Sequence, residues 1–268
     1  MFRFLRRVLH AFIFNFVIYG VSTEMAYLSV KDLKPCLDQL QAGDFLVIDI
    51  DDTVITPRAM MFRAQSPHHK IIDDLKKQPN SDPIVAIWRL GRHVMLVEPE
   101  WPEIIESLKS RGVIVIALTQ MHTGTFASIP SVEKWRADEL RSFGITFSPY
   151  ATKTVETLIN NAMPATLYQG ILFTGSHSKV ETFKAFIAKY GKPAKILFID
   201  DRLEHVQALH AFCESVHIEY TGCHYKAALS LPYDPSQDFG DIQSQKLIEE
   251  HIWLDEAQIV TKSSDVHG

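Results

Sequence analysis

From Phe45 onwards, short apolar runs alternate along the chain with amphipathic stretches of helical length. The apolar runs are FLVID at 45–49, VIVIAL at 113–118, GILFTG at 170–175, KILFID at 195–200 and a last run at 216–220. Runs that are this short and this uniformly apolar are typical of parallel strands that are covered on both faces. We therefore predict a strand at each of them.

The stretches between these runs carry the signals of helices. The predicted helices cover 99–112, 132–143, 178–190 and 203–212. Ser131 is placed to cap the second helix, whose Glu133, Asp138 and Glu139 we expect to face solvent. Strands that alternate with helices predict an α/β fold with a doubly wound parallel sheet. In such sheets ligands bind beyond the carboxyl ends of the strands.

Two segments depart from this alternation. Residues 57–98 contain four prolines, two short amphipathic stretches and no convincing strand pair, so we predict a small, mostly helical cap insertion there. From about residue 231 the pattern indicates a loop, one polar helix at about 240–253 and a solvated tail. We expect residues 27–268, including these segments, to form one domain.

The first 26 residues differ in composition from the rest. Arg3, Arg6 and Arg7 precede an apolar run from Val8 to Gly20. A basic start followed by a short apolar run is typical of a secretory signal peptide, and an uncleaved N-terminal anchor is the alternative. We expect an exported protein, periplasmic or secreted, with a membrane as partner only if this segment stays as an anchor.

Charge and cysteine content argue against a nucleic-acid partner, a disulfide framework and a zinc site. A net charge of -5 argues against a broad nucleic-acid interface, which needs clustered Lys and Arg. The three cysteines, Cys36, Cys213 and Cys223, are too widely spaced for a disulfide framework or a zinc site. Buried free thiols are the simpler interpretation, and a Cys213–Cys223 disulfide stays open.

The candidate chemistry begins at the end of the first predicted strand. Asp49 and Asp51 lie two residues apart there, with Thr53 two further on. Two carboxylates held this close repel each other, which raises the pKa of one of them unless a cation relieves the repulsion. The alternative is a solvated acidic turn in which Thr53 caps a helix.

Later strand ends add further polar residues. Thr119 follows the second strand, and its hydroxyl can donate to a phosphoryl oxygen. Lys179 opens a predicted helix, where a cation opposes the helix dipole and favours an anionic partner; a surface lysine is the alternative. Asp200 and Asp201 end the fourth strand and suit a hard cation, or else an acidic helix cap. Together these groups are the set that in-line phosphoryl transfer uses.

In these motifs the sequence resembles the haloacid dehalogenase-like (HAD) superfamily of hydrolases, most of which are phosphatases. The matching segments are IDIDDTV at 48–54, ALTQ at 117–120, SK at 178–179 and FIDD at 198–201. The resemblance covers about 44–220 and implies a Rossmann-like core with a small helical cap. More loosely, the chain is similar to an uncharacterised bacterial phosphatase-like branch near the exported acid phosphatases.

The resemblance implies a role for each residue. Asp49 is the nucleophile that forms an aspartyl-phosphate, and Asp51 is the general acid and base. Thr119 and Lys179 hold the phosphoryl oxygens, with Lys184 as a substitute for Lys179. Mg²⁺ is the implied cofactor, and its implied ligands are Asp49, the backbone carbonyl of Asp51, Asp200 and Asp201.

The function that follows is hydrolysis of a phosphomonoester, with a phosphorylated small molecule or a phosphoprotein as substrate. Two alternatives remain open from the sequence. One is a non-catalytic binding or interaction protein on the same fold. The other is a phosphomutase on the same core, which transfers the phosphoryl group to an acceptor instead of water.

Overall fold

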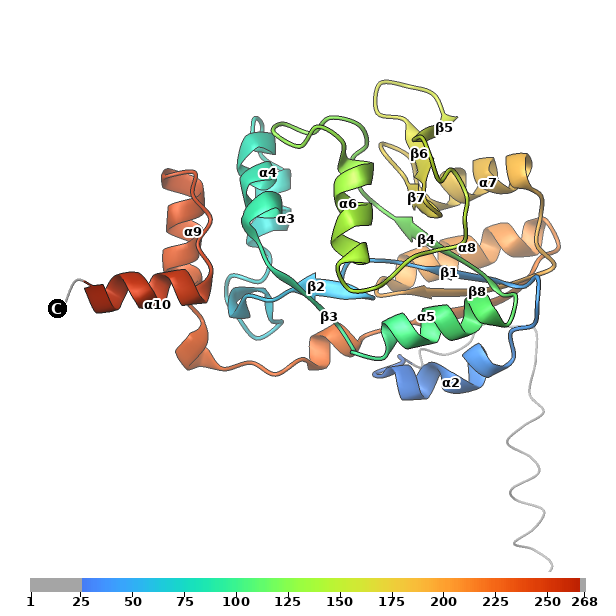
Figure 1. Ribbon diagram of the computed structural model, residues 1–268, viewed down its shortest axis with the longest axis horizontal. Helices are drawn as coiled ribbons and strands as arrows, with labels where there is room; N and C mark the ends of the chain where they lie inside the picture. The colour runs from blue at the N-terminus through green and yellow to red at the C-terminus, as the bar shows by residue number, and fades with distance from the viewer. Residues whose placement is uncertain (1–25, 266–268) are drawn as a thin grey trace, which may run out of the picture.

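The computed structural model describes residues 26–265, and its centre is a seven-stranded sheet in the order β5-β6-β7-β4-β1-β8-β9 (Figure 1). Its parallel strands are β1 (Phe45–Ile48), β4 (Ile114–Thr119), β7 (Ile171–Phe173), β8 (Lys195–Asp200) and β9 (Glu219–His224). The sequence predicts all five, although β9 begins three residues after the expected start at Val216. The apolar runs are thus the buried strands of one sheet.

Helices cover both faces of this sheet, because successive side chains of a strand point to opposite sides. Leu46 and Ile48 of β1 pack into one apolar cluster, and Phe45 and Val47 pack into another. On the first face lie α2 (Val30–Asp38), α5 (Trp101–Ser110) and α6 (Val132–Arg141); on the second lie α7 (Lys179–Tyr190) and α8 (Leu203–Ser215). This is a Rossmann-like α/β fold, as the alternation predicts.

The strand order places a ligand-binding position at the end of β1. From β1 the chain crosses to β4 and then β7 on one side, and later returns to β8 and β9 on the other side. The carboxyl ends of β4 and β8 therefore flank that of β1, at a point where the connections run in opposite directions. Ligands of open α/β sheets bind at such a switch point.

One edge of the sheet is antiparallel, which the prediction of a parallel sheet did not include. Strands β5 (Glu156–Ile159) and β6 (Ala165–Tyr168) precede β7, and each pairs antiparallel with the next. Gln169 and Gly170 connect β6 to β7 with φ values of 49° and 76°. Two left-handed residues in succession make the tight hairpin turn that joins twisted antiparallel strands.

The segment predicted as an insertion leaves the sheet through a strand pair that the sequence did not reveal. Strand β2 (Ile55–Pro57) pairs antiparallel with β3 (Val94–Leu96). Between them lie the short helix η1 (Met60–Phe62) and the helices α3 (Ile71–Lys76) and α4 (Asp82–Gly91). Three-residue strands are too short for a period to be read from sequence. We call residues 55–96 the insertion.

The C-terminal part returns to the insertion. It consists of η2 (Ala227–Ser230), η3 (Pro235–Gln237), α9 (Gly240–Glu249) and α10 (Glu256–Asp265). Figure 1 shows α9 beside α4, at the end of the molecule remote from α7 and α8. Trp253 contacts Gly91 at the end of α4, and its ring lies 5.9 Å from that of Phe62.

Three sequence expectations concern the N-terminus and the cysteines. The signal peptide or anchor was predicted for residues 1–26, and of these residues 1–25 lie outside the described residues. Among residues 26–265 no helix is both long and apolar enough to cross a membrane. Cys36, Cys213 and Cys223 are free thiols, and the last two are buried.

Candidate active site

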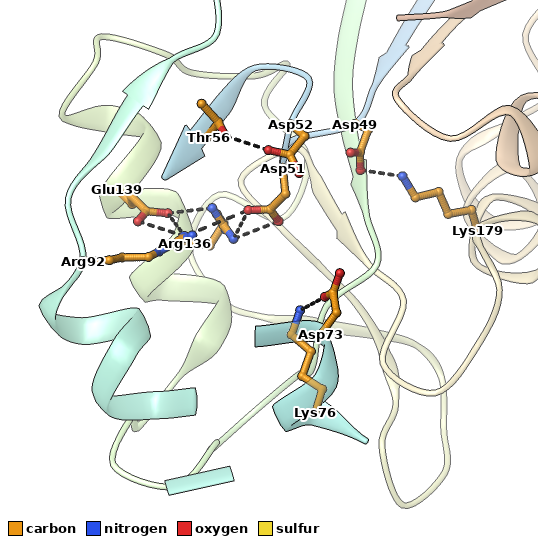
Figure 2. Close-up of polar contacts among 10 residues, drawn as sticks. All are labelled: Asp49, Asp51, Asp52, Thr56, Asp73, Lys76, Arg92, Arg136, Glu139 and Lys179. Carbon is orange, nitrogen blue, oxygen red and sulfur yellow. Dashed lines mark hydrogen bonds and ion pairs between the residues drawn. The ribbon is translucent and has the colours of Figure 1, made fainter. Parts of the chain in front are cut away.

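A tight turn after β1 separates the two carboxylates of the first motif. The carbonyl of Ile50 accepts hydrogen bonds from the backbone N–H groups of Thr53, Val54 and Ile55, and Asp52 adopts a φ of 58°. As a result Asp49 faces Lys179, while Asp51 faces Arg136 (Figure 2). The chain continues into β2, so Thr53 does not cap a helix.

Lys179 connects the first motif to the end of β8. Its ammonium donates to Asp49 at 2.5 Å and to Asp200 at 2.6 Å, and its side chain is 3% exposed. Ser178 fixes this position, because its hydroxyl caps the first turn of α7 and Glu181 caps back. The surface-lysine alternative is excluded for Lys179, whereas Lys184 is exposed.

The charges of this buried group are strongly coupled. Burial raises the pKa of Asp49 to about 7, although Lys179 acts in the opposite direction. Burial and the neighbouring Asp49 and Asp200 raise the pKa of Asp201 to about 9. Burial also raises the pKa of Asp200, but Lys179 and His205 outweigh it and hold that pKa below its usual value. The site therefore carries more carboxylate than its one ammonium compensates.

The donor chemistry fits a hard divalent cation. One carboxylate oxygen each from Asp49, Asp200 and Asp201 lies within 4.8 Å of the others. Oxygen ligands of this kind are those that Mg²⁺ prefers, and a cation relieves the excess charge. The side chain of Asp51 does not join this group, and metal binding by its backbone carbonyl stays a prediction.

Asp51 instead belongs to an arginine cluster. Arg136 donates to both of its carboxylate oxygens, at 2.9 and 3.0 Å, and Arg92 lies 4.0 Å away. Burial raises the pKa of Asp51, but these guanidinium groups outweigh it and leave the pKa below its usual value. Asp51 is therefore ionised in the ligand-free protein.

The structure corrects the expected orientation of α6. Glu133 is 1% exposed and accepts hydrogen bonds from Gly124 N–H and the Thr166 hydroxyl. Glu139 pairs with Arg136 at 2.6 Å and Arg92 at 3.3 Å. The expectation that both glutamates face solvent is wrong, because Gly124, Thr166, Arg92 and Arg136 of α6 itself hold them inside with hydrogen bonds and ion pairs.

Sequence reasoning missed the arginines themselves, Arg89, Arg92 and Arg136. A signal was present: Arg136 lies midway between Val132 and Leu140, at the four-residue spacing that defines the apolar side of α6. A charged residue at such a position has to find a partner inside the protein.

One cavity of about 740 Å³ is lined by Asp49, Asp51 and Lys179 and by the three arginines. It lies between the carboxyl ends of the strands and the insertion, and its walls include Thr119 at the end of β4. The predicted site residues in its wall are Asp49, Asp51, Thr119, Lys179 and Asp201, and Asp200 lies directly behind them on Lys179. From the insertion, α3 contributes Lys76 and Asp73, which pair at 3.1 Å (Figure 2).

Fold and site together define an α/β protein of Rossmann-like type with a lysine-bridged carboxylate cluster at the switch point. Over residues 27–259 the chain matches the family described as "Protein of unknown function (DUF2608)". It belongs to that family.

Relatives of the chain occur in Rickettsia. An uncharacterized protein of Rickettsia prowazekii is 26% identical over 236 residues, which is 85% of each chain. An uncharacterized protein of Rickettsia felis is 28% identical over 140 residues, 48% of this chain and 47% of the relative. No solved structure matches the chain.

Proposed function

We propose that this protein is a Mg²⁺-dependent phosphohydrolase of phosphomonoesters, built on a HAD-like core. The observation that carries the proposal is the position of Asp49. It follows the central strand, its carboxylate receives a 2.5 Å hydrogen bond from a buried lysine, and Asp200 and Asp201 lie within 4.8 Å. A nucleophilic carboxylate beside a cation site and an ammonium is the arrangement that phosphoryl transfer requires.

In the proposed reaction Asp49 attacks phosphorus, and the bond from phosphorus to the leaving oxygen breaks. Lys179 and Thr119 neutralise and orient the phosphoryl oxygens. Water then attacks the aspartyl-phosphate, which releases phosphate and restores Asp49. Mg²⁺, held by Asp49, Asp200 and Asp201, would supply positive charge for the phosphoryl oxygens and shield the nucleophile from them.

Asp51 carries the proton in both half-reactions. Its ionised state beside Arg136 is the one that accepts a proton from the attacking water. To protonate the leaving oxygen first, its pKa has to rise in the substrate complex. The negative charge of an incoming phosphoryl group acts in that direction, since a like charge disfavours the ionised carboxylate.

The test is release of phosphate from p-nitrophenyl phosphate with Mg²⁺ or with EDTA. We expect metal-dependent hydrolysis in the wild type and a loss of ~10³-fold or more in Asp49→Asn, on the scale of removing a nucleophile. Asp38→Asn, at an exposed position of α2, is the matched control and should keep full activity. An Asp49→Asn variant that hydrolyses the ester normally would refute the mechanism.

The same assay separates the alternatives. A phosphomutase would transfer the phosphoryl group to an added acceptor and release little free phosphate. A non-catalytic binding protein would release none, yet would still bind phosphate analogues in the cavity. The lysine bridge and the carboxylate cluster favour the phosphohydrolase, because a binding module has no need of a desolvated nucleophile.

A further inference from the structure

One side of the cavity is an arginine wall, made of Arg89 on α4, Arg92 directly after α4, and Arg136 on α6. These residues are only 5%, 7% and 1% exposed. A buried guanidinium is costly unless carboxylates or other acceptors satisfy its charge and its N–H groups. The number of acceptors near the wall therefore decides whether the charges and N–H groups of these arginines are all satisfied.

The carboxylates of the wall do not suffice for three cations. Asp51 and Glu139 accept from Arg136 at 2.6–3.0 Å and lie 3.3–4.0 Å from Arg92. Two carboxylates thus serve two arginines. Among the described residues no carboxylate forms an ion pair with Arg89.

Arg89 is the cation left over. It lies in the last turn of α4, three residues before Arg92, which follows the helix, and both residues line the cavity. Its guanidinium carbon lies 4.5 Å above the ring of Phe126, and its Nη1 has no hydrogen-bond partner among the described residues. Burial, together with the positive charge of Arg136, lowers the pKa of Arg89 to about 10.

Other hydrogen-bond donors near Arg89 also lack acceptors. In the described part of the chain, Arg92 Nε, Arg136 Nε and the indole N–H of Trp88 also lack partners. Every one of these groups is a donor, and none can accept a hydrogen bond. Trp88 belongs to the same cavity wall. The missing component is therefore an acceptor with negative charge, which is an oxyanion.

The cavity links this wall to the nucleophile. Asp49 and Arg89 line the same space of about 740 Å³, a volume typical of sites for whole small molecules and far larger than one phosphoryl group needs. A ligand can thus reach both ends at once.

We propose that the arginine wall binds a second anionic group of the substrate. The substrate class is then a phosphomonoester that carries a second phosphate or a carboxylate, with its scissile phosphate at Asp49 and its other oxyanion at Arg89. This inference rests on the proposed function for the first of these two positions and on the arginine wall alone for the second.

The experiment compares three ligands with the same number of carbon atoms by calorimetry on the full chain with Mg²⁺. Propylphosphonate has one anionic group, whereas 3-phosphonopropionate adds a carboxylate and propane-1,3-bisphosphonate adds a second phosphonate. We expect at least one of the two-headed ligands to bind ~10-fold or more tightly than propylphosphonate, the scale of a charge-assisted hydrogen bond. The one that gains more identifies the oxyanion.

Variants of the protein test whether the gain in affinity depends on the arginine wall. Arg89→Gln should reduce the advantage of the two-headed ligand to within ~2-fold, and Arg89→Lys should retain part of it, since the charge remains without the forked geometry. Arg141→Gln, on the exposed side of α6, is the matched control and should keep the full advantage.

The outcomes separate this inference from the proposed function. The second anion site would be overturned if the wild type bound all three ligands with equal affinity, a result that does not depend on the folding of any variant. It would also be overturned if a folded Arg89→Gln variant kept the full advantage of the two-headed ligand. Hydrolysis of p-nitrophenyl phosphate would then still support the phosphohydrolase. Arg89-dependent binding without any hydrolysis would keep the anion site and overturn the phosphohydrolase.

Discussion

Lys179 determines the charge state of the carboxylate cluster. Its ammonium lies between Asp49 and Asp200 and contacts both, so its one positive charge is shared by two of the three carboxylates when no cation is bound. Asp201 receives no such contact, and its pKa rises to about 9 because of burial and its two acidic neighbours. Ionisation of Asp201 therefore destabilises the folded state relative to the unfolded chain.

This imbalance predicts how stability depends on pH. In EDTA the folded protein keeps a proton on Asp201 up to about pH 9, whereas the unfolded chain loses it near pH 3.8. Because the folded state binds the extra proton, the free energy of unfolding falls as pH rises between these values. Asp201→Asn removes that group, so the variant should melt several degrees above the wild type at pH 8 and close to it at pH 4.

Melting curves at the two pH values, with EDTA or Mg²⁺, check this. Mg²⁺ should raise the melting temperature of the wild type at pH 8 and raise that of Asp201→Asn less, since one ligand is gone. Asp241→Asn, whose side chain is 98% exposed, should behave as the wild type. If Asp201→Asn melts below the wild type at pH 8 in EDTA, the charge imbalance is not what limits stability.

Among the helices and strands, those that local sequence determines were predicted, and those that depend on tertiary contacts were not. Strands such as β1 and β8 are apolar on both faces, and Ser131 and Ser178 cap their own helices, so local sequence reveals them. Strand β5 has no fully buried residue, and its pairing with β6 depends on tertiary contacts.

The candidate site divides in the same way. Its carboxylates and Lys179 fall at strand ends and a helix start, which sequence can locate. The arginine wall needs α4 and α6 side by side, which no local pattern specifies. Arg136 alone leaves a signal in the sequence, because it lies at an apolar position of α6; Arg89 and Arg92 are recognised only when the two helices are seen together.

The connection from β7 to α7 offers a test of how rigidly Lys179 is held. Gly175, four residues before Lys179, has a φ of 59°, and a Cβ there would meet the carbonyl oxygens of Met163 and Pro164. Gly144 also has a positive φ, of 76°, but nothing lies within 4 Å of its Cβ position. Both positions suffer the left-handed penalty of a side chain, and only Gly175 adds a backbone clash.

We expect Gly144→Ala to cost ~1–2 kcal/mol of unfolding free energy, the left-handed penalty alone. Gly175→Ala should cost ~2 kcal/mol more and reduce the proposed phosphatase activity, because the loop that carries Lys179 has to shift. Urea unfolding and the hydrolysis assay measure the two effects. Equal costs for the two variants would mean that the connection is looser than the structure indicates.

At the scale of the whole molecule, the C-terminal helices secure the insertion. Trp253 is 8% exposed and packs on Gly91 and Phe62. Glu256 accepts a hydrogen bond from Met60 N–H at 2.8 Å, and Asp255 lies 2.6 Å from His93. These contacts join the last elements of the chain to both ends of the insertion.

Trp253→Ala should therefore loosen the insertion and leave the sheet unchanged. Removing a buried indole costs ~3–5 kcal/mol locally. Hydrogen exchange should accelerate ~10-fold or more in α4 and in the β2–β3 pair, while β1 and β4 keep their protection. Ile252→Ala, at the neighbouring position with 45% exposure, is the control. A uniform acceleration across the whole chain would show instead that Trp253 supports global stability.

This arrangement also has a consequence for synthesis. The ribosome delivers the insertion early and the helices that secure it last, so the cavity acquires its final shape only when translation is complete. A chain that stops before residue 240 would retain every carboxylate and lysine of the site, yet would lack α9 and Trp253, which pack against α4. Premature termination would thus yield a protein that keeps these side chains but lacks the contacts that hold α4, and Arg89 with it, in the cavity wall.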